Sequence, residues 1–355
     1  MTGGGRRIAL VLGPSEGGIG RHVAQLASWL RDDGWVVVVV APPAVLDRFS
    51  LDGPGSVALG GRPDRAGIRS TVRAVRAIRS AATVHAHGLR AGAMSGLLAG
   101  RPHLGRPRLV VTWHNAVPAR GWQRRLFALG EKFTVRTADV LIGASRDLTD
   151  RARSLGARDA RTIPVPAPPP PEPGARPLPP LPTTRSLVVS VGRLAPQKNL
   201  SAMLDVAALV RDAQPDVCFV VAGEGPEREP LQRRIDAEGL PVHLIGDTTA
   251  VAELLGNADV FLLTSHWEAR ALVVQEAMRA GVPVVVPAVG GLPELVEDGG
   301  IVVPPGDLPT MSRDIVALLD DPARRERLGA RAREIADGWP ADDELFAAVR
   351  DTYEG

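Results

Sequence analysis

The chain has 355 residues, of which 45% are hydrophobic, so it is long enough for two domains with separate cores. Its single cysteine, Cys218, excludes a disulfide framework and lies in an apolar run, which favours a buried thiol in a reducing compartment. No run of about 18 apolar residues occurs, so we expect no membrane-spanning helix.

The net charge of +2 conceals two oppositely charged halves. Residues 1–165 hold 25 Lys and Arg against 11 Asp and Glu, whereas the remaining residues hold 17 against 29. A basic first half indicates an anionic partner, such as a phosphorylated acceptor or a membrane surface. The alternative is simple solvation in an arginine-rich chain.

Short β-branched runs alternate with amphipathic segments in the first half, which is typical of βαβ units and a parallel sheet. The chain begins Met1-Thr-Gly-Gly-Gly-Arg6-Arg7, and the apolar run that follows ends at Gly13, so we expect a first strand and no signal peptide. The expected strands are residues 8–12, 36–40, 84–87, 109–112, 140–143 and 162–165.

A second alternation follows a proline-rich stretch, which predicts a stiff linker at residues 166–182. Helices broken at Gly338-Trp339-Pro340 are expected to close the chain. We therefore expect an N-terminal domain at 1–165, a C-terminal domain at 183–335 and a terminal helix at 336–355. The expected strands of the second domain are residues 187–192, 217–223, 242–246, 260–264, 282–286 and 301–303.

Two carboxylates, Glu268 and Glu276, have seven residues between them, with Glu268 in a turn after an expected strand and Glu276 on the first turns of an expected helix. Vicinal hydroxyls of a sugar and of a ribose are bound well by carboxylates, which accept charge-assisted hydrogen bonds in pairs. The helix, expected to begin near residues 269–271, would turn free N–H groups toward a diphosphate. The alternative is a pair of solvated helix carboxylates.

Two cations, Arg193 and Lys198, follow the first strand of the second half. Their spacing allows both to converge on one diphosphate, where they would stabilise the charge of a leaving nucleoside diphosphate. The alternative is a solvated loop. Gly223-Glu224-Gly225 follows the next strand and can bring backbone close to a base or ribose.

A glycine-rich segment at residues 13–20, which includes Gly17-Gly18, is expected to open a helix at Arg21. Its backbone can approach an anion closely, and the alternative is a plain tight turn. A dinucleotide fingerprint would also need an acid after the second strand, where this chain has Ala41-Pro42-Pro43. A dehydrogenase is therefore disfavoured.

Taken together, these motifs resemble those of the retaining GT-B glycosyltransferases of family GT4. In the second half the resemblance rests on Gly192-Arg193 with Lys198, Gly223-Glu224-Gly225, Glu268 with Glu276-Ala277, residues 281–286, Gly291-Leu-Pro-Glu294 and Pro304-Pro-Gly-Asp307. The first half matches more loosely, through Gly17-Gly18 with Arg21-His22-Val23, Val84-His85-Ala86-His87 and residues 111–115.

The resemblance implies two doubly wound parallel-sheet domains that face each other across a cleft, with a terminal helix that crosses back to the first domain. It implies that Glu276 holds the ribose, Glu268 a donor-sugar hydroxyl, and Arg193 with Lys198 the diphosphate. His114 would lie under the donor sugar near the anomeric carbon and act with Arg193, Lys198 and Glu268 in catalysis. The remaining implied contacts to the nucleotide sugar are Gly17, Gly18, Gly223, Glu224, Ala271 and Leu272.

No metal and no cofactor beyond the nucleoside-diphosphate sugar is expected, since the chain contains no Asp-x-Asp. His85 and His87 are interpreted as core or acceptor-side packing because no third ligand is evident. The chain departs from the family at Ala269-Arg270-Ala271, where glycines are usual. This departure favours one alternative, a catalytically silent sugar-nucleotide binding protein.

The acceptor is suggested by a basic amphipathic pattern. Arginines at 69, 73, 76 and 79 interleave with Val72, Val75 and Ile78, and a second basic segment occupies residues 122–127. Such segments suit an anionic membrane and a lipid-linked or phosphorylated acceptor, whereas the alternative is a core-facing stripe with solvated arginines. Aromatic residues make up only 4%, so nucleic-acid binding is not expected.

The sequence thus predicts a cytoplasmic, metal-independent, retaining glycosyltransferase that moves a sugar from a nucleoside-diphosphate sugar to an acceptor hydroxyl. A peripheral position at the inner face of the membrane is a further expectation. A sugar-nucleotide epimerase or hydrolase on the same fold is a second enzymatic alternative.

Overall fold

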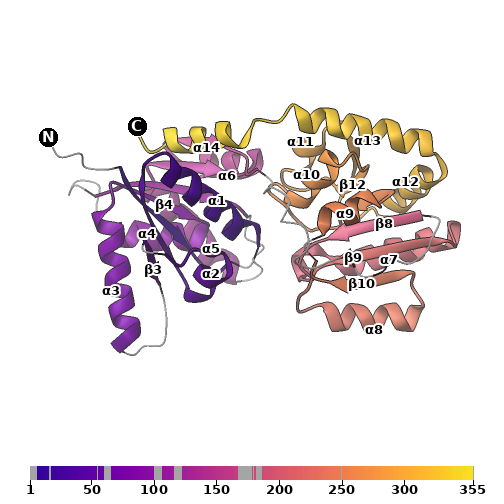
Figure 1. Cartoon of the computed structure of the whole chain (residues 1–355), viewed down its shortest axis with the longest axis horizontal. Coiled ribbons are helices and arrows are strands. Elements are labelled where there is room, and N and C mark those ends of the chain that lie inside the picture. The colour runs from indigo at the N-terminus through magenta and orange to yellow at the C-terminus, as the bar shows by residue number, and fades with distance from the viewer. Residues whose placement is uncertain are drawn as a thin grey trace. The chain divides into compact units, whose positions relative to one another are not determined.

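The computed structural model describes residues 6–15, 17–53, 55–59, 65–99, 106–115, 122–166, 178, 180, 186–248 and 250–354, without the side chains of 65–67 and 122–124. The chain forms two compact units, one of Met1–Pro168 with Pro340–Gly355 and one of Pro169–Trp339 (Figure 1). The linker predicted at 166–182 lies almost entirely outside the described residues.

The N-terminal unit contains a seven-stranded parallel sheet with the order β3-β2-β1-β4-β5-β6-β7. Its strands read as nearly continuous apolar runs because helices cover both faces of the sheet. The strands are β1 (Arg7–Leu12), β2 (Val36–Ala41), β3 (Ser56–Ala58), β4 (Thr83–His87), β5 (Arg108–Trp113), β6 (Val140–Gly143) and β7 (Ala160–Thr162).

One expectation for this sheet was wrong, and one strand was not predicted. The last strand lies at Ala160–Thr162 and not at 162–165, since Pro164 and Pro166 have no N–H group to give to a strand ladder. Strand β3, a three-residue strand at the edge of the sheet without an apolar run, was not predicted.

The helices of this unit lie on the two faces of the sheet. Alternate residues of each strand point to opposite faces, and those on one face, such as Leu10, share a core with α1 and α14. On the other face, α4 approaches β5 closely at Gly92, where an added Cβ would lie 2.8 Å from Val111. The helices are α1 (Gly18–Asp32), α2 (Pro43–Arg48), α3 (Arg65–Ser80), α4 (Leu89–Ala99), α5 (Trp122–Thr137), α6 (Arg146–Ser154) and α14 (Asp342–Asp351).

The C-terminal unit contains a six-stranded parallel sheet with the order β10-β9-β8-β11-β12-β13. The strand order reverses at β8, so the carboxyl ends of β8 and β11 flank the position where ligands bind in such sheets. The strands are β8 (Ser186–Val191), β9 (Val217–Ala222), β10 (Val242–Gly246), β11 (Val260–Leu262), β12 (Val284–Pro287) and β13 (Gly300–Val303).

Two apolar cores lie on the two faces of this second sheet. Cys218 in β9 is buried as expected, and burial raises the pKa of its thiol to about 11. The helices are the 3-10 turn η1 (Pro196–Lys198), α7 (Leu200–Ala213), α8 (Arg228–Glu238), α9 (Val251–Gly256), α10 (Leu272–Arg279), α11 (Leu292–Val296), α12 (Leu308–Asp320) and α13 (Pro322–Asp337).

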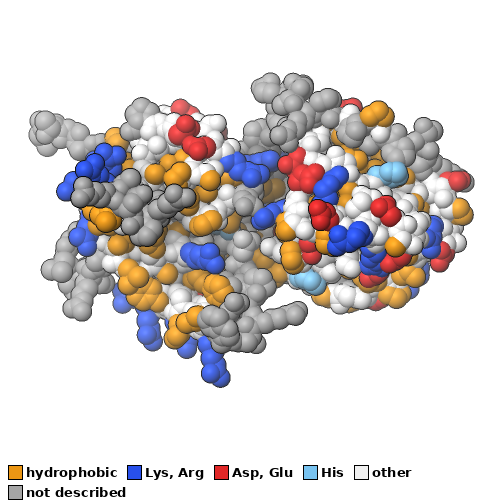
Figure 2. Space-filling view, turned by 90° about the horizontal axis from the view of Figure 1, so that it is seen from below, with side chains coloured by type: hydrophobic (Ala, Val, Ile, Leu, Met, Phe, Trp, Pro, Cys, Tyr) orange, Lys and Arg blue, Asp and Glu red, His pale blue; other side chains and the backbone are white. Residues whose placement is uncertain are grey.

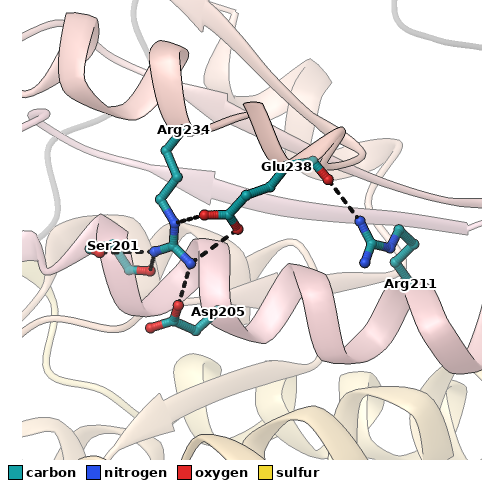
Figure 3. Close-up of polar contacts among 5 residues, drawn as sticks. All are labelled: Ser201, Asp205, Arg211, Arg234 and Glu238. Carbon is teal, nitrogen blue, oxygen red and sulfur yellow. Dashed lines mark hydrogen bonds and ion pairs between the residues drawn. The ribbon is translucent and has the colours of Figure 1, made fainter. Parts of the chain in front are cut away.

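A polar network fastens α8 to α7 (Figure 3). The Arg234 guanidinium donates to the carboxylates of Asp205 and Glu238 and to both oxygens of Ser201. Arg211 donates to the backbone carbonyl of Glu238, 3.1 Å away. The hydrogen bond from Arg234 lowers the pKa of the Glu238 carboxyl. These contacts hold the outer helix α8 against the helix that follows the η1 turn.

The chain ends in the N-terminal unit. Helix α13 ends at Asp337, and α14 begins at Asp342 after the Gly338-Trp339-Pro340 break. Phe346 and Tyr353 then enter the core shared with α1 and the first sheet. In the part of the chain that the structure describes, no helix is both long enough and apolar enough to cross a membrane.

Candidate functional site

In the C-terminal unit, the structure brings together two residues that the sequence placed in separate motifs. The Nζ atom of Lys198, in the η1 turn after β8, lies 2.7 Å from Oε1 of Glu268, in the segment after β11. Their side chains are only 21% and 11% exposed. The ion pair therefore lies at the switch point of the sheet, where a ligand is expected.

Backbone contacts hold Lys198 in this position. The hydroxyl of Thr264, after β11, donates to the carbonyls of Lys198 and Asn199 at 3.2 and 3.0 Å. The N–H of His266 donates to the carbonyl of Gln197 at 2.9 Å. The η1 turn is thus fixed to the segment that carries Glu268.

Glycines make room for this arrangement. A Cβ on Gly192 would lie 3.3 Å from the Cε atom of Lys198, whose side chain packs over the bare backbone. Gly223 adopts φ +139°, and a Cβ there would lie 2.0 Å from the carbonyl oxygen of Gly192. The loops after β8 and β9 therefore contact each other through backbone, which only glycine at 223 permits.

The loop after β9 also carries Glu224, which was predicted to contact the donor. Its carboxylate is exposed and lies 3.0 Å from the Arg228 guanidinium one turn along. A second exposed side chain, Arg193, lines a shallow hollow together with Gly192 and Lys198. Arg193 and Lys198 thus line the same hollow, and their convergence on one diphosphate stays a prediction.

Helix α10 begins at Leu272 with Ala271 as its N-cap, one residue later than the latest expected start. Its first N–H groups have no acceptor within the helix and give this end a partial positive charge. Glu276 lies half-buried in the second turn. Glu268, three residues before the N-cap, accepts a backbone hydrogen bond of 2.9 Å from Gly291. The carboxylate of Glu268 is therefore held on a fixed backbone near a helix N-terminus.

Arg270, where the chain departs from the family, does not extend into solvent. Its guanidinium carbon lies 5.1 Å from the Trp339 ring centroid, in cation–π geometry. Burial lowers the pKa of the guanidinium to about 10. Its Nε atom is buried and has no hydrogen-bond partner among the described residues. The unusual charge in this loop is thus held against Trp339.

In the N-terminal unit, His114 belongs to a buried cluster of four histidines. His114 follows β5, and its Nε2 lies 3.1 Å from Nδ1 of His87 at the end of β4. The His22 ring, from α1, lies 5.5 Å from His114 and 5.7 Å from His87 between centroids. The His85 ring lies 4.1 Å from His87. The parallel register of β4 and β5 brings these side chains together.

Helix α14 and the turn after it complete this histidine cluster. The hydroxyl of Tyr353 and Nδ1 of His85 are 2.7 Å apart, and Nε2 of His85 lies 2.7 Å from the Thr112 hydroxyl. The Phe346 ring stacks on His22 at 6.0 Å. A residue more than 200 positions from β4 therefore contacts the cluster to which the predicted catalytic histidine belongs.

All four histidines are neutral at pH 7. Burial lowers the pKa of His22 to about 4 and that of His85, which also faces His22, to about 3. The pKa values of His87 and His114 are lowered well below 6.5 by burial and by the neighbouring histidines. Despite the cluster, no group of three His, Cys, Asp or Glu within the described residues has the arrangement of a metal site.

The glycines predicted at the start of α1 occupy its first positions. Gly17 is the exposed N-cap residue and Gly18 begins the helix, three residues before the expected start at Arg21. The sterically required glycine is Gly20, where a Cβ would lie 2.1 Å from the Phe49 ring. Neither the steric need for Gly20 nor the places of His22 and Tyr353 in the cluster were predicted from the sequence.

Two protein-family models match the chain, one in each unit. Residues 17–168 match the family described as a glycosyl transferase 4-like domain, and residues 175–335 match the family described as glycosyl transferases group 1.

Curated relatives are named as glycosyltransferases or as synthases of sugar compounds. The chain is 34% identical over 177 residues to the alpha-D-kanosaminyltransferase of Streptomyces kanamyceticus, which covers 48% of this chain and 45% of that protein. The match thus spans about half the length of that relative. The chain is 28% identical to the alpha-maltose-1-phosphate synthase of Mycolicibacterium smegmatis over an alignment of 367 positions. This alignment covers 90% of each protein.

A solved structure with the same fold is Anabaena HepE in complex with UDP-glucose, with a TM-score of 0.80 and 18% identity over 98% of this chain and 99% of that one. The two parallel sheets agree with this likeness. With a family match in each unit, the chain belongs to the glycosyltransferases of the GT-B fold.

Proposed function

We propose that this protein transfers a sugar from a nucleoside-diphosphate sugar to an acceptor hydroxyl, with retention of configuration at the anomeric carbon and without a metal ion. The observation that carries the proposal is the ion pair between Lys198 and Glu268 at the switch point of the second sheet. Lys198 has the positive charge that attracts the diphosphate of such a donor. Glu268 has the carboxylate that can accept a hydrogen bond from its sugar.

The pair has a direct role in donor binding. Each charge satisfies the other at low solvent exposure. A donor diphosphate attracts Lys198 and Arg193, and the released Glu268 carboxylate accepts a hydrogen bond from a sugar hydroxyl. Glu276 is assigned to the ribose, as the resemblance implies. The N-terminus of α10 adds a partial positive charge near the diphosphate.

The proposed reaction needs no covalent intermediate. The acceptor oxygen bonds to the anomeric carbon on the face from which the diphosphate leaves. The bond from that carbon to the phosphate oxygen breaks with its electron pair, and the acceptor proton moves to the same oxygen. Lys198 and Arg193 stabilise the growing negative charge on the diphosphate. We assign His114 a contact with the donor sugar as a neutral imidazole, because its lowered pKa opposes proton uptake.

The first donor to test is a UDP-sugar. HepE, which has the same fold, was solved with UDP-glucose bound, and this supports a uridine nucleotide as the first choice. A panel of UDP-, GDP-, ADP- and dTDP-sugars extends the search. The acceptor is proposed to be lipid-linked or phosphorylated, in keeping with the basic N-terminal half.

The test is turnover of radiolabelled donors with a lipid extract or with soluble phosphorylated acceptors. Transfer of label to an acceptor, together with release of nucleoside diphosphate, supports the proposal. Release of free sugar instead would identify a hydrolase, and an altered sugar nucleotide would identify an epimerase. Binding without turnover over the whole panel would identify a silent binding protein. Lys198→Ala should abolish transfer, whereas Arg233→Ala, on the exposed face of α8, should not.

A further inference from the structure

Three helices of the N-terminal unit, α3, α4 and α5, lie side by side along the chain's first sheet (Figure 1). Nε of Arg79 in α3 donates to the carbonyl of Leu98 in α4 at 3.1 Å. Gly96 in α4 is in close contact with α5, since a Cβ there would lie 2.6 Å from the hydroxyl of Thr137. The outer sides of the three helices therefore form one surface, which we call the α3–α5 surface.

This surface exposes large apolar side chains. In the part of the chain that the structure describes, seven large hydrophobic side chains are exposed, and five of them belong to these three helices. They are 42–70% exposed, and they are Ile68 and Val72 in α3, Leu97 in α4, and Leu126 and Leu129 in α5. Single exposed apolar residues are normal, but a group of five on adjacent helices is typical of a contact surface.

The same surface is strongly basic. The sequences of α3, α4 and α5 together contain ten Lys and Arg and one acid, Glu131. That acid is already engaged by Arg151, whose Nη2 lies 2.8 Å away. The exposed basic side chains are Arg69, Arg73, Arg76, Arg79, Arg90, Arg125, Lys132 and Arg136. Figure 2 likewise shows hydrophobic and basic side chains together on the N-terminal unit, with few acidic ones.

We propose that the α3–α5 surface docks on an anionic lipid membrane. Leucine and isoleucine side chains enter the boundary between head groups and acyl chains, and arginines around them bind the lipid phosphates. Exposed apolar side chains do not contribute to binding a nucleic-acid backbone. The described part of the surface also exposes no large aromatic side chain for base stacking, so a membrane is favoured over a nucleic acid. The alternative, a face of arginines that serves only solubility, does not explain the five exposed apolar residues beside them.

This docking is independent of the proposed transfer reaction, because none of its residues belongs to the donor site. It deepens the proposed function in one respect, since a docked protein meets acceptors that are anchored in the same membrane. Binding to vesicles and binding of a nucleotide are separate measurements, so failure of one proposal does not imply failure of the other.

The test is flotation of the full chain with vesicles of phosphatidylcholine alone or mixed with phosphatidylglycerol. We expect at least tenfold stronger binding to the anionic vesicles, and a loss of binding as salt is raised. Arg69→Glu with Arg73→Glu should reduce binding at least tenfold. Leu126→Asp with Leu129→Asp should do the same, because the apolar contact is as necessary as the charge.

Two matched controls keep this test specific. Arg233→Glu reverses an exposed charge on α8, and Leu209→Asp replaces an exposed leucine on α7, both in the C-terminal unit. Both should bind vesicles like the wild type, and unchanged unfolding midpoints should show that all variants are folded. Equal recovery with the two vesicle types would overturn the proposal. So would full binding by the double leucine variant, or tighter binding to duplex DNA or to an acidic protein than to vesicles.

Discussion

The Nζ atom of Lys198 lies 2.7 Å from Oε1 of Glu268, although 70 positions separate the two residues along the chain. This ion pair occupies the place where a donor diphosphate and a donor sugar are proposed to bind. We therefore expect a donor to rearrange the pair, and the two residues should respond differently to the two parts of the donor.

Glu268→Gln should separate those two responses. The variant leaves Lys198 without its partner, so bare UDP, which has no sugar, should bind at least as tightly as it binds the wild type. UDP-glucose, or whichever donor the panel identifies, should bind at least tenfold more weakly, because a charge-assisted hydrogen bond contributes about 1.5–3 kcal/mol. Titration calorimetry with both ligands measures the two effects. Equal losses for UDP and for the sugar nucleotide would contradict the assigned role of Glu268.

Lys198→Ala should weaken the binding of both UDP and the sugar nucleotide. The diphosphate loses a cation, and Glu268 is left at low exposure without its ionic partner. We expect a loss of tenfold or more for UDP in the same titration, with Arg233→Ala as the control. Unchanged affinity for UDP would show that the diphosphate binds elsewhere.

Gly223→Ala should destabilise the C-terminal unit. The added Cβ would lie 2.0 Å from the Gly192 carbonyl oxygen, and φ +139° is strained for any other residue. Backbone strain of this kind costs about 1–3 kcal/mol, and the steric conflict adds to it. Urea unfolding compares the variant with Gly256→Ala, where a Cβ meets no atom within 4 Å. The control should be neutral or slightly stabilised, and equal effects of the two changes would contradict the structure around Gly223.

The free energy of unfolding of the N-terminal unit should fall as the pH is lowered below 6.5. The folded protein holds His22 and His85 with pKa values of about 4 and 3, below the ordinary 6.5, so the unfolded chain binds more protons as the pH falls below 6.5. Stability is fully present above pH 6.5 and declines toward pH 4, by up to about 1.4 kcal/mol per pH unit for each such histidine. Unfolding midpoints between pH 5 and pH 7.5 measure this slope. His22→Phe should flatten it, whereas His243→Gln, at an exposed position, should not.

Tyr353 should stabilise the N-terminal unit through His85. Tyr353→Phe removes a buried hydrogen bond and leaves Nδ1 of His85 without its partner, which costs about 1–3 kcal/mol. A double-mutant cycle with His85→Leu isolates the contact. The two changes should be non-additive by about 1 kcal/mol in urea unfolding. Additive effects would mean that the two side chains do not interact in solution.

Most strands could be predicted because buried parallel strands are continuous apolar runs, which are visible without a structure. Lys198 and Glu268 could be chosen as candidates because each stands just after such a strand, and the structure pairs them, while their roles stay predictions. Strand β3 was not predicted because it is a short edge strand, and β7 was misplaced because prolines follow its last ladder residue. The expected cleft between the two domains stays a prediction.

The histidine cluster was not predictable from local patterns. It depends on the register between β4 and β5, on the orientation of α1, and on a tyrosine 268 positions after His85. Arg270 was notable in the sequence, but its contact with Trp339 follows from the packing of α13 near α10, which only the fold determines.

The most direct test of the proposed function is the stereochemistry of the product. A UDP-sugar with an α linkage and a 13C label at the anomeric carbon should be incubated with the protein and an acceptor that accepts label. The carbon–hydrogen coupling constant at the anomeric carbon then reports the configuration by NMR. We expect an α-linked product and stoichiometric UDP, with no effect of EDTA on the rate. A β-linked product, or labelled free sugar as the sole product, would contradict the proposed function.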